Sequence, residues 1–177
     1  ETGTYEFKKE KFVRTPMRFV GGGSGRVNFD QLFKLIEKGS KKRIILTGDF
    51  GAGKSMHLRE IFLKLAKKHT AGQVEAFPVA LNMREFAQLE TPDEALRRHA
   101  ERLGSKHLGE KLIRAWKAGF VTLLIDGFDE MVPRTSAKDA RRIQDIRRQS
   151  LLVIRRLVSE TPAESTIVIS GRSHYFS

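Results

Sequence analysis

Apolar residues follow the chain in two alternating patterns, short continuous runs and longer stretches with helical spacing. The short runs predict strands at residues 44–47, 74–81, 121–125 and 166–170. The stretches in which apolar residues recur three and four positions apart predict helices at residues 29–38, 54–69, 91–103, 109–118 and 137–160. Because strands alternate with helices, the pattern predicts an α/β fold with a parallel sheet and right-handed crossovers.

Local residue choices refine this arrangement. The run Val121–Ile125 is almost continuously apolar, which predicts a strand buried on both faces. Pro78 lies inside the second strand and has no N–H to donate, so we expect that strand at an edge of the sheet. Thr91, followed by Pro92 and two acids, has the residue order of a helix start.

The first 38 residues are predicted to form a flank rather than part of the core. Residues 4–20 are polar and aromatic, and Gly21–Gly25 is a glycine-rich segment typical of a flexible turn or linker. The short helix at residues 29–38 would be capped by Asn28 or Asp30. The core is then predicted to span residues 39–177.

The segment from Gly48 to Ser55 reads GDFGAGKS and fits the phosphate-loop pattern GxxxxGK[ST]. A strand precedes it and a helix follows it, which is the context that makes a chance match improbable. Backbone N–H groups of such a loop surround a triphosphate, while Lys54 would reach the β- and γ-phosphates and the Ser55 hydroxyl would bind Mg²⁺. The predicted nucleotide-binding residues are Gly48, Asp49, Phe50, Gly51, Ala52, Gly53, Lys54, Ser55 and Met56.

Charged residues follow two of the other predicted strands. Asp126 ends the buried run 121–125, where it would bind Mg²⁺ directly or through water. Asp129 and Glu130 come just after it and could orient or deprotonate an attacking water; an acidic surface turn is the alternative. Arg172 follows the strand 166–170 and could stabilise charge on the γ-phosphate.

Composition narrows the class of protein. The chain has no cysteine, which excludes disulfides and cysteine-based zinc sites and fits a reducing, cytoplasmic setting. No apolar run is long enough to span a bilayer, there is no signal-peptide pattern, and the first residue, Glu1, suggests an excised piece. The net charge of +12 admits nucleic acid or an acidic membrane surface as a partner, although the basic residues are scattered.

The segments GDFGAGKS, FPVALNMREF, LLIDGFDEM and TIVISGR together resemble the NACHT domain of the STAND class of P-loop NTPases. The resemblance runs from Arg43 to Arg172. It implies a P-loop NTPase three-layer sandwich with an ASCE-type strand order and the second strand at the edge. It also implies a core at residues 39–177 that stops after the sensor 1 strand and lacks the C-terminal strand and lid subdomains.

The resemblance also assigns roles. In AAA+ proteins a Glu directly follows the Walker B Asp; here Gly127 stands in that place, so Asp129 and Glu130 become the catalytic candidates. Arg172 matches the sensor 1 arginine.

The function that the resemblance implies is an ATP- and ADP-binding, slowly hydrolysing signalling module with Mg²⁺ as cofactor. Its nucleotide state would control self-association and effector activation in innate immunity or anti-phage defence. No NKxD segment that would read guanine is present, which favours ATP over GTP. The alternative, motivated by the +12 charge, is a nucleic-acid-stimulated P-loop ATPase.

Overall fold

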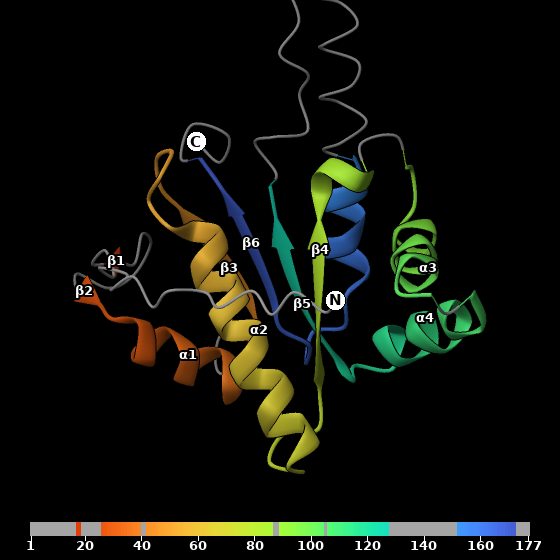
Figure 1. Cartoon of the computed structure of the whole chain (residues 1–177), viewed down its shortest axis with the longest axis horizontal. Helices are drawn as coiled ribbons and strands as arrows, with labels where there is room; N and C mark the ends of the chain where they lie inside the picture. The colour runs from red at the N-terminus through yellow and green to blue at the C-terminus, as the bar shows by residue number, and fades with distance from the viewer. Residues whose placement is uncertain are drawn as a thin grey trace, which may run out of the picture.

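A parallel β-sheet forms the centre of the molecule in the computed structural model (Figure 1), which describes residues 17–18, 26–39, 42–86, 89–104, 106–127 and 152–172. Four strands make up this sheet in the described part of the chain: β3 (Arg43–Thr47), β4 (Phe77–Asn82), β5 (Val121–Asp126) and β6 (Ile167–Gly171). Each strand is parallel to its neighbours, as the alternation of strands and helices predicted.

Helices cover both faces of the sheet (Figure 1). The helices with full bounds are α1 (Phe29–Glu37), α2 (Lys54–Thr70), α3 (Pro92–Arg102) and α4 (Gly109–Lys117), and a further helix spans residues 152–160. Single-turn 3₁₀ helices occupy Met83–Phe86 (η1) and Lys106–Leu108 (η2). Helices α1 and α2 pack on one face, whereas α3, α4 and the helix 152–160 pack on the other, so the fold is a three-layer sandwich.

The two hydrophobic cores follow directly from the alternation of side chains along the central strands. Leu124 of β5 and Val168 of β6 belong to the core formed with α1 and α2. Their chain neighbours, Leu123, Ile125 and Ile167, belong to the core formed with α3, α4 and the helix 152–160. Because successive side chains of a strand point to opposite faces, both central strands are buried on both sides, as predicted for Val121–Ile125.

The strand order in the sheet is β3-β6-β5-β4. Strand β6, the last along the chain, therefore lies between the first and the third, which is the predicted ASCE-type order. Strand β4 pairs only with β5 in the described sheet, so Pro78 stands in an edge strand as predicted. The predicted α/β P-loop NTPase fold is thus confirmed.

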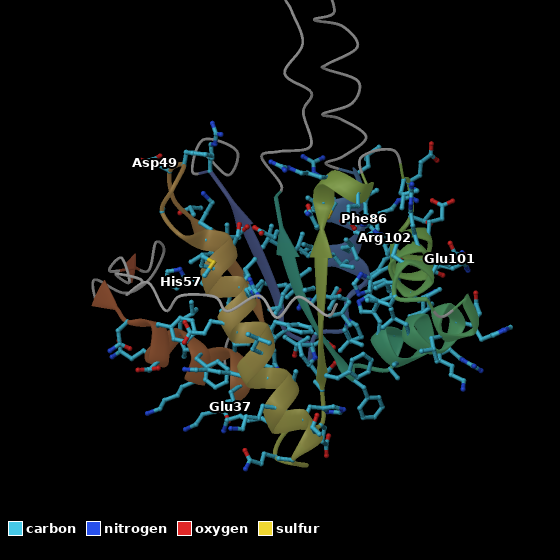
Figure 2. The ribbon with its side chains drawn as sticks, in the orientation of Figure 1. Glu37, Asp49, His57, Phe86, Glu101 and Arg102 are labelled. Atoms are coloured by element: carbon cyan, nitrogen blue, oxygen red, sulfur yellow. The ribbon has the colours of Figure 1, made fainter. Side chains whose placement is uncertain are left out.

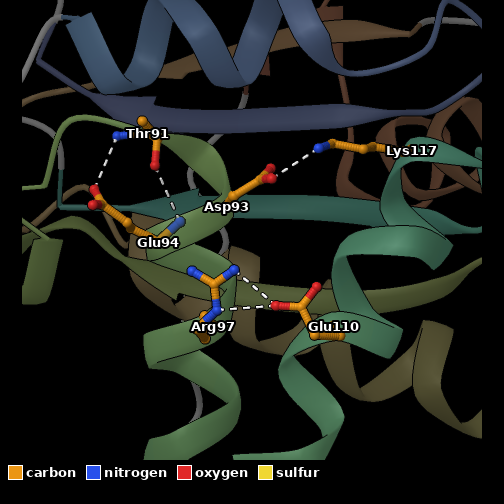
Figure 3. Close-up of polar contacts among 6 residues, drawn as sticks. All are labelled: Thr91, Asp93, Glu94, Arg97, Glu110 and Lys117. Carbon is orange, nitrogen blue, oxygen red and sulfur yellow. Dashed lines mark hydrogen bonds and ion pairs between the residues drawn. The ribbon is translucent and has the colours of Figure 1, made fainter.

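Capping side chains fix where the helices begin. Asn28 accepts a hydrogen bond from the Gln31 N–H and caps α1, so Asn28 rather than Asp30 is the cap. Thr91 and Glu94 form a reciprocal capping box at the start of α3 (Figure 3). Such caps each stabilise a helix by about 0.5–2 kcal/mol relative to alanine.

Ion pairs hold α3 against α4 at the outer side of this layer. Arg97 donates a hydrogen bond to Glu110 at 2.8 Å, and Lys117 donates one to Asp93 at 2.8 Å (Figure 3). Glu110 also raises the pKa of Arg97 by its hydrogen bond and its charge. Beneath these exposed pairs, Trp116 is fully buried and donates its indole N–H to the Thr161 hydroxyl at 2.9 Å, which ties α4 to the turn before β6.

Some predicted boundaries differ from the structure. Two short strands, β1 (Met17–Arg18) and β2 (Arg26–Val27), pair antiparallel on either side of the glycine-rich segment, where a flexible turn or linker was expected but no strands were predicted. Strand β4 begins at Phe77 rather than at residue 74, because Phe77 pairs with Val121, the first residue of β5.

Other predictions are only partly covered by the structure. Residues 137–151 of the predicted long helix lie outside the described part, and the division into a flank and a core stays a prediction. None of the helices in the described ranges has the length and hydropathy that a bilayer crossing needs.

Candidate functional site

The loop that connects β3 to α2 has the backbone shape of an anion-binding loop. Gly51 and Gly53 have φ angles of +80° and +77°, in the left-handed region that side-chain-bearing residues rarely adopt. Gly53 is the N-cap of α2, and no side chain in the described residues caps this helix or places an acid in its first turn. The first N–H groups of α2 are therefore directed at a position where an anion would be stabilised.

Gly48 anchors the loop to the neighbouring strand. Its N–H donates to the carbonyl of Gly171 at the end of β6, with a distance of 3.3 Å. A Cβ at Gly48 would lie 3.0 Å from the Cβ of Ala52, closer than real Cβ contacts normally allow. The loop is thus tight on itself and fixed to β6, which sets where its other N–H groups lie.

Lys54 brings a positive charge to the same position. Its ammonium group donates to the carbonyls of Gly48, at 2.7 Å, and Asp49, at 3.0 Å. A cation at a helix N-terminus opposes the helix dipole, so this end of α2 has two reasons to favour a bound anion. The lysine is held across the loop, within reach of whatever the loop surrounds.

The outer surface of the loop is open to solvent. Phe50 is 82% exposed and Met56 50% exposed, while Asp49 and Ser55 are also exposed. Figure 2 shows Asp49 on the loop at the edge where the strands end, far from Glu37 at the opposite edge.

On the inner side of the loop, His57 is buried and its Nδ1 lies 2.8 Å from the carbonyl of Gly53, so an imidazole supports the helix start. Sequence reasoning missed His57; the one signal was a polar residue inside the apolar spacing of α2.

Asp126 is placed at the end of β5 by the same alternation that builds the cores. It follows Leu124 by two positions, so it faces the α2 side of the sheet, where the phosphate-loop candidate lies. Its Oδ1 accepts a hydrogen bond from the hydroxyl of Ser170 on β6. Ser170 was not singled out from the sequence, because a serine inside an apolar strand carries no signal that is distinct from ordinary packing.

Arg172 lies next to the loop by strand register. Thr47 pairs with Gly171, so the residue that follows each strand, Gly48 on one side and Arg172 on the other, is at the same edge. Arg172 is half-buried there. The structure thus brings the loop, Asp126 and Arg172 to one edge of the sheet, while Asp129 and Glu130 lie outside the described residues.

The oxygens at this edge fit a small hard cation. Ser55 offers an exposed hydroxyl and Asp126 a half-buried carboxylate, and oxygen is the ligand atom that Mg²⁺ prefers. Across the residues that the structure describes, no group of three or more His, Cys, Asp or Glu side chains could hold a metal alone. A cation here would therefore need phosphate and water oxygens as well, which is the usual way Mg²⁺ is bound.

One comparison with known protein families places most of the chain in a single family. A family model described as the NACHT domain matches residues 42–175. Among solved structures, one described as the structure of Drosophila ORC bound to DNA is similar with a TM-score of 0.44 and 16% sequence identity. That similarity covers 82% of this chain but 37% of the other, so this chain spans little more than a third of it. A search of curated protein sequences gives no match.

Proposed function

The chain belongs to the NACHT family, a family of nucleotide-binding P-loop NTPase modules, and we propose from this premise that it binds ATP and ADP with Mg²⁺ and hydrolyses ATP. The observation that carries the proposal is the start of α2. There a left-handed glycine loop, an uncapped helix N-terminus and the Lys54 ammonium converge, and no acid of the first turn opposes an anion.

In this proposal each residue of the loop edge has a separate task. N–H groups of residues 49–56 would bind the phosphates, while the Gly48 N–H stays on the Gly171 carbonyl. The Lys54 ammonium would exchange the carbonyls of Gly48 and Asp49 for phosphate oxygens. Ser55 and Asp126 would hold Mg²⁺, which when bound neutralises phosphate charge.

Hydrolysis requires a water oriented opposite the leaving group. We assign that role to Asp129 or Glu130, which follow β5 and would accept the proton of the attacking water. As the bond from the water oxygen to the γ-phosphorus forms and the bond to the bridging oxygen breaks, negative charge shifts from the γ-phosphoryl oxygens onto the bridging oxygen of the leaving ADP. Arg172, at the same edge of the sheet, would stabilise that charge.

The finer function rests on the family. We propose that the nucleotide state controls self-association of the protein, and thereby an effector in innate immunity or anti-phage defence. Light scattering of the protein with ADP, and then with a slowly hydrolysed ATP analogue, tests this directly. A larger assembly with the analogue supports the proposal, and the same mass in both states contradicts it.

Two substitutions test binding and hydrolysis separately. Lys54→Ala should abolish calorimetric binding of Mg-ADP and Mg-ATP, whereas Lys64→Ala, on the same helix but paired with Asp30 and Glu60, should leave it unchanged. Replacing Asp129 with Asn and Glu130 with Gln together should keep binding and remove turnover. Wild-type turnover in that double variant would refute the assignment of the base, and equal binding by both lysine variants would refute the site.

Adding DNA or RNA to the ATPase assay distinguishes a nucleic-acid-stimulated ATPase from the proposed signalling module. With a net charge of +12, the chain is expected to bind DNA or RNA weakly at low salt whatever its function. A nucleic-acid-stimulated ATPase should instead hydrolyse ATP faster when DNA or RNA is added, with a stimulation that falls as salt rises. A turnover rate that ignores nucleic acid at every salt concentration removes this alternative.

A further inference from the structure

We propose that Ser170 is a positioning residue that holds the Asp126 carboxylate in the orientation needed to bind the Mg²⁺ of a nucleotide complex. The inference rests on the proposed function and adds to it a residue on β6 that neither the motifs nor the family match singles out. The observation behind it is the hydrogen bond from the Ser170 hydroxyl to Oδ1 of Asp126.

Strand geometry puts both side chains on the correct side of the sheet. Leu124 of β5 is directly opposite Val168 of β6, and both pack against α2. Two residues further along each strand, Asp126 and Ser170 must face the same way, toward the start of α2. Their contact is therefore built into the register of two central strands rather than into a loop.

The chemistry of the contact favours one carboxylate orientation. A hydroxyl that donates to a carboxylate makes a charge-assisted hydrogen bond, which is about twice as strong as a neutral one. Ser170 is fully buried, so water does not compete for its hydroxyl. Since the bond engages one lone pair of Oδ1, Oδ2 keeps both of its lone pairs for a cation or for the waters around it.

Strand β6 also contacts the other parts of the candidate site. Its Gly171 carbonyl accepts the N–H of Gly48 in the phosphate loop, and Arg172 follows one residue later. Ser170 and Gly171 of β6, and Arg172 directly after it, thus position the carboxylate, anchor the loop and supply a positive charge. Ser170 is the member of this set whose removal changes a single hydrogen bond.

Ser165, just before β6, provides a matched control. Like Ser170 it is a buried serine, 3% exposed, but within the described residues its hydroxyl has no hydrogen-bond partner. The fold therefore tolerates a buried serine hydroxyl that positions no other group. Ser165→Ala removes the same atom as Ser170→Ala at the opposite edge of the sheet.

The test measures ADP affinity by calorimetry, with Mg²⁺ and with EDTA, for the 177-residue chain. Loss of a group that orients a metal ligand typically lowers metal affinity 10–100-fold. Ser170→Ala should therefore lose about that much of the gain in ADP affinity that Mg²⁺ provides, and keep its affinity in EDTA. Ser170→Thr, which keeps the hydroxyl, should restore the gain, and Ser165→Ala should match the wild type in both buffers.

A second measurement removes the ambiguity of a folding defect. In an Asp126→Asn background, Ser170→Ala should have no further effect on the Mg²⁺ gain, because the two residues act as a unit. If Ser170→Ala does not fold, Ser170→Cys replaces the hydroxyl with a weak donor of similar shape and should show a smaller loss of the same kind.

The outcomes separate the two proposals. A wild-type Mg²⁺ gain in Ser170→Ala, an equal loss in Ser165→Ala, or additive losses with Asp126→Asn would overturn the positioning role while leaving nucleotide binding intact. An absence of ADP binding by the wild-type chain would overturn the proposed function itself.

Discussion

Alanine at Gly51 should weaken nucleotide binding without greatly weakening the fold. Gly51 has a φ of +80°, and a Cβ built there meets nothing within 4 Å. The substitution therefore causes no clash, and its cost is conformational: about 1–2 kcal/mol for holding a side-chain-bearing residue in the left-handed region. Because the loop is exposed at Phe50, the free protein can relax the strain by moving the loop.

Binding must then restore the original loop shape. The 1–2 kcal/mol appears in the affinity, which corresponds to about a 5–30-fold weaker Kd for Mg-ADP in calorimetric titration. Gly104, after α3, is the control, because it has the same φ of +80° and the same open surroundings. The Gly104 N–H donates to the Glu101 carbonyl at the end of α3, which holds the backbone at this position. The strain of an alanine there would therefore lower the stability of the folded protein.

Gly104→Ala should therefore lower Tm by roughly 2–8 °C, the shift that 1–2 kcal/mol produces in a domain of this size, and leave the Kd unchanged. Gly51→Ala should show the reverse pattern. Wild-type affinity of Gly51→Ala for Mg-ADP, or an equal loss of affinity in both variants, would contradict a loop that must recover its left-handed shape to bind.

Other predictions concern the layers that support the site. Trp116→Phe should cost about 2–4 kcal/mol in urea denaturation, since it removes buried volume and the indole donor to Thr161; a loss below 1 kcal/mol would contradict this. Thr91→Ala should cost about 0.5–2 kcal/mol by the same assay and Thr91→Ser much less, whereas equal losses would exclude the capping box. Burial lowers the pKa of His99, partly offset by Glu85, so the unfolded chain protonates this residue first as the pH falls. The free energy of unfolding should therefore fall on acidification through about pH 6.5, the pKa of an unfolded histidine, and His99→Gln should flatten that fall between pH 7.5 and 5.5; an equal slope in both proteins would contradict it.

Much of the fold was predictable because its signals are local. Pro78 lacks a donor N–H wherever it stands, so its strand had to be an edge strand. The sequence around Thr91 caps a helix through groups at most four residues apart, and the apolar run 121–125 indicates burial regardless of its partners. In each case a few neighbouring residues restrict the local structure or its burial, and the structure agrees with the expectation.

The features that the sequence did not predict depend on pairing between segments that are distant along the chain. The start of β4 is set by the position of Val121 in β5, and the β1–β2 pair forms between two-residue strands too short to have a pattern. The contact of Ser170 with Asp126 arises from the register of two strands, and neither residue type predicts it from the sequence. The roles of Asp129 and Glu130 stay predictions, since both lie beyond the described end of β5.

The central position of β6 has a consequence for how the protein is made. During synthesis β3 and β5 leave the ribosome well before β6, yet neither lies beside the other in the finished sheet. Until β6 arrives, β3 has no partner among the strands that the structure describes, the Gly48 N–H lacks its acceptor and the Asp126 carboxylate lacks its donor. Pairing at such sequence separation is slow and leaves strand edges exposed meanwhile. An incomplete nascent chain would therefore need protection from aggregation, and it would have no formed phosphate site with which to capture cellular nucleotide before translation reaches Gly171.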